Sequence, residues 1–185
     1  MTTTAPPTVR ALNHVELVYA PGDRARARAL FELLGFEIRD SGGPFLTGMI
    51  ATGQQDFANN ALYASEVTPE QWALEQALRA ALTDGPLTGP AAGYLDDLAA
   101  HPQRSCHFGI RYPTAADLDA VLDRIATVAD HTPDLVGRVS VSGVFRPGDP
   151  GSYTDMMTQA FVRTDVIASG LLAFGQHIEL QWQVP

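Results

Sequence analysis

The sequence predicts an α+β fold in which one β-α-β-β-β unit occurs twice. Two stretches, beginning at Leu12 and at Ser105, share a design: a short apolar strand that carries a histidine, a proline at the turn, and an amphipathic helix. Strand-like segments separated by Gly, Pro, Asn and Asp follow each helix. Because a half of this size buries its sheet poorly alone, we expect the two halves to share one core within a single domain.

The composition suits a single globular domain. The chain has 185 residues and 45% of them are hydrophobic, so a core can form without metal ions or disulfides as staples. Cys106 is the single cysteine, which rules out an intramolecular disulfide and favours a reducing, cytoplasmic location. Residues 1–10 lack the apolar core of a signal peptide and are expected to form a flexible tail. No apolar run approaches the roughly 20 residues that a membrane-spanning helix needs.

The charge of the chain argues against two classes of partner. The formal net charge is −9, whereas a nucleic-acid-binding protein normally carries a basic stripe. Arg24, Arg26 and Arg28 alternate in one predicted helix and are interpreted as a solvated helix face. The same acidity opposes binding to anionic membrane surfaces. We therefore expect no nucleic-acid partner and no membrane partner.

The first half, residues 11–67, begins with the strand ALNHVELVY. Pro21 marks the turn after this strand, Asp23 is placed to cap a helix, and Gly35 is placed to end that helix. The helix carries one apolar stripe at positions i, i+3, i+4 and i+7: Ala27, Leu30, Phe31 and Leu34. Three strand-like segments follow: FEIRD, PFLTGMIAT and NALYASEV, separated by SGG and by GQQDFAN.

The second half, residues 105–185, repeats this order with the opening strand SCHFGIRY. Pro113 marks the turn, and Thr114 with Asp117 three residues later forms a capping-box pattern. The apolar stripe of the helix consists of Leu118, Val121, Leu122 and Ile125. The strand-like segments that follow are GRVSVSGVF, MTQAFVRTDVIA and LAFGQHIELQWQV.

Residues 68–104 form an insertion that we interpret as a helical linker between the halves. Thr68 is an N-cap candidate, Pro69 suits the first helical position, and Gln71 suits the capping-box partner. The apolar edge of this helix consists of Leu74, Leu78 and Leu82. The remainder, GPLTGPAAGYLDDLAAHPQRS, is rich in Gly and Pro and has room for one short helix.

Strand parity predicts which side chains share a surface, because successive residues of a strand point to opposite faces. On the opening strand of the first half, His14 and Glu16 share one face. On the opening strand of the second half, His107 and Arg111 share one face, with aliphatic and aromatic residues behind. The last strand has one polar front: His177, Glu179, Gln181 and Gln183. Three strands therefore combine an apolar back with a polar front.

Two imidazoles and one carboxylate make a common open metal site, and His14, His107 and Glu179 supply them. This donor set suits a divalent ion of Fe, Mn, Ni, Co or Zn. Three protein ligands leave positions free for water or substrate. A lone histidine in a half-buried strand is usually a satisfied polar residue, but the recurrence of the histidine at equivalent points of the repeat favours the metal site. His177 is an alternative ligand or a wall of the pocket.

Charged neighbours of these ligands are candidates for catalytic roles. Glu16 lies two residues along from His14 on the same face, where it could orient a ligand or act as a general base. A salt bridge between Glu16 and Arg111 is the competing interpretation. Either Arg111 or Arg163 could hold a carboxylate of the substrate.

In the order of its motifs the chain resembles the vicinal oxygen chelate superfamily, which includes glyoxalase I, extradiol dioxygenases, methylmalonyl-CoA epimerase, and fosfomycin- and bleomycin-resistance proteins. The segments that carry the resemblance are LNHVELV, ALFELLGF, NALYASEV, CHFGIRY and HIELQWQV. The resemblance implies two βαβββ modules paired into a cupped, incompletely closed mixed β-barrel with helices outside. It also implies a metal ion held by His14, His107 and Glu179.

The chain departs from glyoxalase I at the strand that closes the first half. Matching NNALYASEV to QHIELQWQV sets Leu62 opposite Glu179, where glyoxalase I has a fourth ligand. Glu66 has the same parity but lies too far along unless a bulge shifts the register. Three ligands fit the dioxygenase and fosfomycin-enzyme patterns better, with Tyr63 and His177 as stand-ins for the additional tyrosine and histidine of the dioxygenases.

The expected function is that of a metal-dependent enzyme that chelates neighbouring oxygens of a small-molecule substrate, with dioxygenase-like or glyoxalase/lyase-like chemistry. The alternative is a non-catalytic protein that sequesters a small molecule, as bleomycin-resistance proteins do. The sequence leaves open the substrate, the metal, the participation of Glu66 or His177, and whether the chain forms a homodimer.

Overall fold

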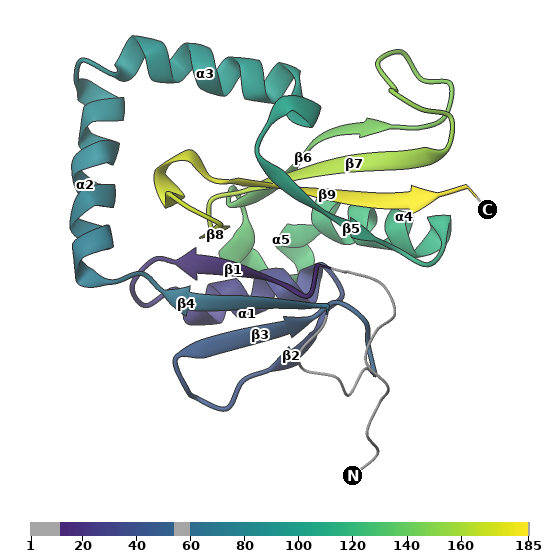
Figure 1. The fold of residues 1–185 in the computed structure, drawn as a ribbon, viewed down its shortest axis with the longest axis horizontal. Coiled ribbons are helices and arrows are strands. Elements are labelled where there is room, and N and C mark those ends of the chain that lie inside the picture. Colours follow the sequence, from purple (N-terminus) through teal and green to yellow (C-terminus); the bar gives the residue numbers. More distant parts are fainter. Residues whose placement is uncertain (1–11, 54–59, 185) are drawn as a thin grey trace.

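The computed structural model describes residues 12–53 and 60–184, and it has the expected α+β architecture. Two mixed sheets lie side by side and form a cupped, open arrangement with helices on their outer faces (Figure 1). The predicted tail, residues 1–10, and most of the predicted GQQDFAN loop lie outside the described residues. No helix in the described part of the chain is long and apolar enough to cross a membrane.

The first sheet is built by the first module and closed by one short strand of the second. Its order is β2(Glu37–Arg39), β3(Phe45–Met49), β4(Ala61–Glu66), β1(His14–Tyr19) and β8(Ile167–Ala168). β1 and β4 run parallel, as the βαβββ unit requires, and α1(Arg24–Leu33) covers the back of the sheet. The predicted long strand MTQAFVRTDVIA is thus divided, because its last two residues leave the second sheet and pair with Val18 and Tyr19.

The second sheet repeats the design of the first. Its order is β5(His107–Arg111), β9(Gln176–Gln183), β7(Met157–Thr164) and β6(Val139–Phe145). β5 and β9 run parallel, and α4(Ala115–Ala126) covers the back. Short helical segments complete the module: α5(Val128–His131), η2(Pro133–Leu135) and η3(Leu172–Phe174).

The apolar stripes predicted for the two main helices form the core. Every predicted stripe residue of α1 is fully buried, and those of α4 pack into the same cluster. Thr114 caps α4 as predicted, since its hydroxyl accepts the backbone N–H of Asp117 at 3.1 Å. Asp23 precedes α1 but does not cap it: its carboxylate pairs with Arg26 and Arg138 instead.

The second module terminates the helix of the first. The buried Tyr112 hydroxyl donates to the carbonyl of Leu34 at 2.8 Å, and Arg124 Nε donates to the carbonyl of Leu33 at 3.0 Å. These bonds satisfy carbonyls that have no partner within α1, and the guanidinium favours the negative end of the helix dipole. Gly35 adopts φ +86°, the left-handed conformation that ends a helix, as predicted.

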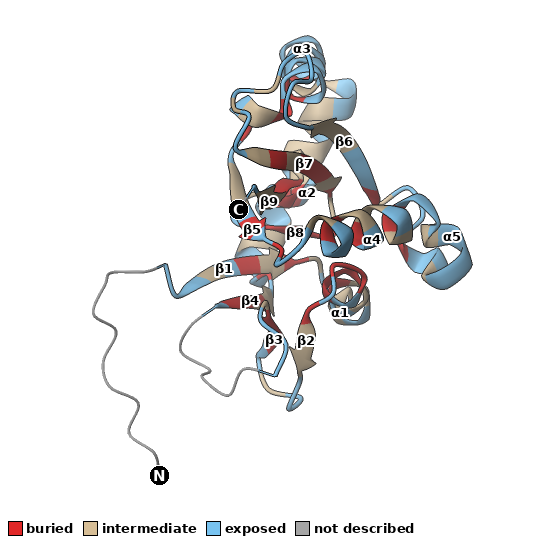
Figure 2. Ribbon diagram, turned by 90° about the vertical axis from the view of Figure 1, so that its right-hand side faces the viewer, coloured by how far each residue is buried: buried red, intermediate tan, exposed pale blue. Residues whose placement is uncertain are grey.

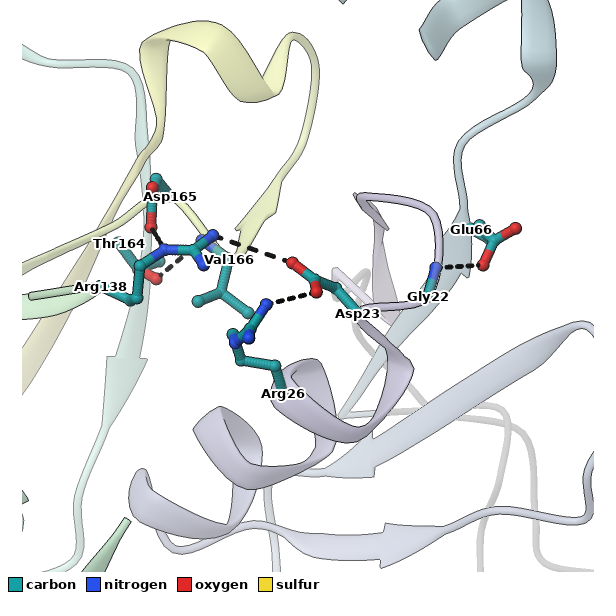
Figure 3. A network of polar contacts seen from close by, with 8 residues as sticks. All are labelled: Gly22, Asp23, Arg26, Glu66, Arg138, Thr164, Asp165 and Val166. Carbon is teal, nitrogen blue, oxygen red and sulfur yellow. Dashed lines mark hydrogen bonds and ion pairs between the residues drawn. The ribbon is translucent and has the colours of Figure 1, made fainter. Parts of the chain in front are cut away.

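Ion pairs bridge the modules near the other end of α1 (Figure 3). Arg138 precedes β6 and reaches Asp165 of its own module at 2.6 Å and Asp23 of the first module at 3.8 Å. The two modules are therefore joined at both ends of α1. Hydrogen bonds join them at its C-terminus, and an ion pair joins them near its N-terminus.

The insertion forms two long helices that project from the sheets and are mostly exposed (Figure 2). These are α2(Pro69–Asp84) and α3(Thr88–Ala100), followed by η1(Pro102–Arg104). Thr68 caps α2 as predicted, whereas the Gln71 side chain donates to the Gly170 carbonyl rather than completing a capping box. The predicted apolar edge is wrong for Leu74, which is 56% exposed. The Gly/Pro-rich remainder forms a helix of 13 residues, longer than expected.

The buried face of α2 is anchored by a carboxylate. Glu75 is 0% exposed, and its two oxygens accept the backbone N–H groups of Leu172 at 2.7 Å and Ala173 at 2.9 Å. These are donors at the start of η3, so Glu75 acts as a cap supplied from a distant segment. A prediction from the leucines alone therefore assigns the wrong buried face to α2.

Candidate metal centre

His107 and Glu179 meet on the concave face of the second sheet. His107 lies on β5 and Glu179 on β9, and their Nε2 and Oε2 atoms are 3.3 Å apart. Glu179 is 8% exposed, and its Oε1 accepts a hydrogen bond of 2.7 Å from Gln159 Nε2 on β7. His107 and Glu179 lie on one face of the sheet, as strand parity predicts, and Ile178 and Leu180 are fully buried on the opposite face.

The tautomer of His107 follows from its second nitrogen. Nδ1 lies 2.8 Å from the carbonyl oxygen of Ser105, and because a carbonyl can only accept, Nδ1 carries a proton. A neutral His107 therefore has a lone pair on Nε2, which faces a Glu179 oxygen that also carries lone pairs. Two acceptors at 3.3 Å repel each other unless a cation, either a second proton or a metal ion, lies between them.

The same cluster contains another acceptor without a donor. Gln159 Oε1 is buried and has no hydrogen-bond partner in the described part of the chain. Turning the amide around would bring this oxygen against the Glu179 carboxylate, so the hydrogen bond from Nε2 fixes the orientation. His107, Glu179 and Gln159 together present lone pairs, which is the electrostatic character of a cation site.

The aromatic and glycine neighbours shape this cluster. The Phe161 ring packs edge-on against the His107 ring, with centroids 5.3 Å apart. Gly109 lies opposite Glu179 on the neighbouring strand, and a Cβ there would be 3.4 Å from Glu179 Oε2. A longer side chain at Gly109 would compete for the space that the carboxylate occupies.

His177 lies beside this cluster but is engaged elsewhere. It is 4% exposed, and its Nε2 is 3.1 Å from the Ser142 hydroxyl. Burial, together with smaller electrostatic contributions from Arg163 and His107, lowers the pKa of His177 to about 4. His177 is therefore neutral at pH 7 and hydrogen-bonded to Ser142, and it lines the wall of the site.

His14 is not gathered with the other two predicted ligands. It is exposed at the start of β1, where its Nε2 lies 4.0 Å from Glu16 Oε1 and its ring lies 5.5 Å from that of Tyr63. Among residues 12–53 and 60–184, no group of three or more His, Cys, Asp or Glu side chains is arranged to hold a metal ion. Of the predicted triad, the structure brings together His107 and Glu179.

The sheet registers identify the counterpart of Glu179 in the first module as Tyr63. Gly109 pairs with Glu179 in the second sheet, and at the equivalent point of the first sheet Glu16 pairs with Tyr63. The sequence match to Leu62 is therefore displaced by one residue, and Leu62 is buried on the opposite face. Glu66 shares that parity, and its carboxylate accepts the Gly22 N–H at 2.9 Å (Figure 3).

The predicted catalytic residues Glu16 and Arg111 lie on separate modules and are both exposed. They form no ion pair with each other within the described residues, so the competing salt-bridge interpretation is not supported. Glu16 instead lines a pocket of about 570 Å³ on the concave face of the first sheet, together with Arg39, Phe45 and Tyr63. This pocket offers space for a small molecule beside Glu16 and Tyr63, whose ring is also in contact with that of His14.

Sequence reasoning missed Gln159 and the Ser105 carbonyl, which set the orientation of Glu179 and His107. Gln159 was accessible to the same parity rule, because it pairs with Gln181 and so shares the polar front of β9. The Ser105 carbonyl gives no sequence signal, since a backbone acceptor is present at every residue.

Comparisons with known proteins give distant similarities. No family model matches the chain, and no curated protein matches it. Solved structures similar over most of their length include the oxidase ChaP-H2, with 14% identity, a TM-score of 0.43 and 96% of each chain covered. They also include the hypothetical protein SA1046 from S. aureus, with 9% identity, a TM-score of 0.44 and coverage of 97% of this chain and 96% of that one. UcmS2 has 19% identity and a TM-score of 0.41, with 94% and 98% covered. At such scores these similarities carry no argument about function.

Proposed function

We propose that the protein is a metal-dependent enzyme of the vicinal oxygen chelate type, with His107 and Glu179 among the ligands of one divalent ion. The observation that carries this proposal is the pair of facing acceptors, His107 Nε2 and Glu179 Oε2, at 3.3 Å. Two ligands about 2.1 Å from one metal ion, at an angle near 100°, are themselves about 3.2 Å apart. The spacing of the pair fits a shared metal ion.

The surrounding groups fit the role of outer-shell partners. A metal-bound histidine usually donates its other N–H to a carbonyl or carboxylate, and Ser105 accepts that N–H from His107. Gln159 holds Glu179 from the other side through its amide N–H. The proposed third ligand is His14 from the first module, as the repeat predicts, and the alternative is the buried Gln159 amide oxygen, which has no hydrogen-bond partner among the described residues.

The chain's own residues would handle a substrate that carries neighbouring oxygens. When bound, the metal ion supplies Lewis-acid polarisation of those oxygens. Glu16 is exposed beside His14, where a carboxylate can accept a substrate proton. Arg111 shares the face of His107 on β5 and can hold an anionic group of the substrate.

A non-catalytic sequestering protein is the second candidate. The same pair is also compatible with a protonated His107 that forms an ion pair with Glu179 and holds no metal. The exposed position of His14 and the 570 Å³ pocket beside it favour this second candidate, because a cup without a gathered triad still binds small molecules.

The test is a substitution of Glu179 by Gln, measured with and without metal. Chelator-treated wild type and the variant would be titrated calorimetrically with Fe(II), Mn(II), Ni(II), Co(II) and Zn(II). We expect wild type to bind one ion per chain and Glu179→Gln to bind at least ~10-fold more weakly, because an amide lacks the negative charge. Glu66→Gln is the matched control, since Glu66 faces away from the site and contacts Gly22.

Melting curves of the metal-free proteins separate the two candidates. In Glu179→Gln the side-chain N–H₂ can donate to His107 Nε2, so two facing acceptors become a donor and an acceptor. At pH 8 we therefore expect the metal-free variant to melt no lower than wild type. A lower melting temperature for Glu179→Gln, together with no metal binding by wild type, would reject the metalloenzyme and support an imidazolium–carboxylate pair. Replacing His14 by Ala and Gln159 by Leu then decides the third ligand.

A further inference from the structure

The helical insertion encloses a cavity on the side of the second module. It has a volume of about 520 Å³ and lies between α2, α3 and the loop that leads from β8 into β9. Its wall is mainly apolar and includes Leu82, Leu87, Ala91, Tyr94, Leu98 and Phe174. Tyr94 and Phe174 face each other edge-on with centroids 5.9 Å apart, one from α3 and one from η3. The volume falls in the range of about 300–1,000 Å³ typical of ligand sites.

Polar anchors at both ends hold this cavity open. On the α2 side, the buried Glu75 carboxylate binds the N–H groups of Leu172 and Ala173, and Gln71 donates to the Gly170 carbonyl. On the far side, Gln103 of η1 donates to the Gly151 carbonyl at 3.0 Å. These bonds tie one end of the insertion to the loop before β9 and the other end to the loop between β6 and β7.

Four polar side chains in the wall, Ser105, Ser169, Gln176 and His177, already have hydrogen-bond partners within the protein. Ser105 Oγ donates to the Pro102 carbonyl at 2.7 Å, and Ser169 Oγ donates to Gln176 Oε1 at 2.9 Å. Gln176 Nε2 in turn donates to the His177 carbonyl at 2.7 Å. No Asp, Glu, Lys or Arg is among the described residues of the wall. An incoming ligand therefore meets apolar surface and few unused hydrogen-bonding groups.

Large apolar side chains in the wall of the cavity are exposed to solvent. Tyr94 is 48% exposed and Leu87 is 42% exposed, both facing the cavity from α3 and its approach. Covering such surface is favourable at roughly 25 cal/mol per Å² of apolar area removed from water. A charged ligand would lose its hydration here without compensation, which disfavours ionic ligands.

We propose that this cavity binds a neutral, predominantly apolar small molecule. The site is built by the insertion and the loop before β9, so it goes beyond the metal-dependent function and does not rest on it. Cys106 also lines the cavity and is exposed, which places the single thiol of the chain where a bound ligand would shield it.

The test uses N-phenyl-1-naphthylamine, a neutral aromatic probe whose fluorescence rises in apolar surroundings. We expect saturable binding of one probe per chain, and slower reaction of Cys106 with an aromatic disulfide reagent when the probe is bound. Ala91→Phe fills the cavity, so affinity should fall by at least about tenfold. Ala92→Phe is the matched control: this neighbour on α3 is exposed and should change affinity by less than about twofold.

Four outcomes would overturn the proposal. The first is an absence of saturable binding. The second is an equal effect of Ala91→Phe and Ala92→Phe on affinity when both variants melt like wild type. The third is probe binding that disappears as the chain dimerises, which would mean that a second copy covers the cavity. An anionic analogue, 1-anilinonaphthalene-8-sulfonate, should bind more weakly, and equal or tighter binding would refute the neutral-ligand assignment. Glu179→Gln should bind the neutral probe like wild type, so failure of the metal proposal is separable from failure of this one.

Discussion

Replacement of Glu75 by Gln tests whether one buried carboxylate holds the insertion to the second module. Glu75 is fully buried on α2, and each of its oxygens accepts one backbone N–H of η3, from Leu172 and Ala173. Gln has nearly the same shape, so packing is preserved. It offers one oxygen instead of two, and its N–H₂ group then faces a backbone N–H.

The magnitude follows from the two hydrogen bonds. One bond to a charged acceptor becomes a bond to a neutral amide, and the other is replaced by a contact between two donors. Leaving a buried donor without an acceptor costs about 1–3 kcal/mol, so we expect the free energy of unfolding to fall by about 2 kcal/mol. For a chain of this size 1 kcal/mol corresponds to roughly 2–4 °C, which gives a drop in melting temperature of about 4–8 °C.

The assay is thermal and urea unfolding followed by circular dichroism, with Glu70→Gln as the matched control. Glu70 lies in the first turn of the same helix and is exposed, so its loss removes a favourable interaction with the helix dipole worth less than about 1 kcal/mol. If Glu75→Gln melts within 1–2 °C of wild type (roughly the control's expected shift), the carboxylate does not anchor the insertion, and the cavity beside it is not held open as described.

Two further changes probe the docking of the modules. Tyr112→Phe removes the hydroxyl that donates to the Leu34 carbonyl, so urea unfolding should show a loss of about 1–2 kcal/mol. Burial raises the pKa of Tyr112 above its ordinary value, so the unfolded state loses this proton first and stability should fall as pH rises above about 10, more in wild type than in the variant. Gly35→Ala should cost about 1 kcal/mol by the same unfolding assay, because φ is +86° there and the new Cβ would lie 3.3 Å from the Arg124 guanidinium; an unchanged midpoint would mean that the helix end relaxes.

Residue periodicity correctly predicted which face is buried in elements that pack one face against the core. The alternation of β5 and β9 placed His107 and Glu179 on one surface, and the structure brings their side chains to 3.3 Å. The stripe of α1 was predicted residue by residue, because a 3.6-residue period maps directly onto a buried face. The repeat supplied the module architecture, since equivalent segments adopt equivalent strands and helices.

Contacts between distant segments were not predictable in this way. Glu75 has no local signal for burial, because its partners lie 97 and 98 residues further along the chain. Asp23 has the residue type and position expected of a helix N-cap, but its carboxylate forms an ion pair with Arg138 of the other module. The register that pairs Tyr63 with Glu16 was missed by one residue because sequence matching of two short strands cannot distinguish adjacent alignments.

The sheet registers show that the two modules place their carboxylates on different strands. In the second module the carboxylate stands on the last strand, at Glu179, opposite a glycine on the first strand. In the first module the carboxylate stands on the first strand, at Glu16, opposite Tyr63 on the last. Each opening histidine thus has a carboxylate neighbour, but the two neighbours come from different strands.

Burial then distinguishes what each carboxylate can do. Glu179 is buried, held by Gln159 and oriented toward His107, so its carboxylate is fixed in one position. Glu16 has a side chain 58% exposed and lines a pocket, so its carboxylate is accessible to solvent and to a small molecule bound there. The second module thus presents a buried, oriented carboxylate beside His107, whereas the first module presents an exposed carboxylate at the edge of a pocket.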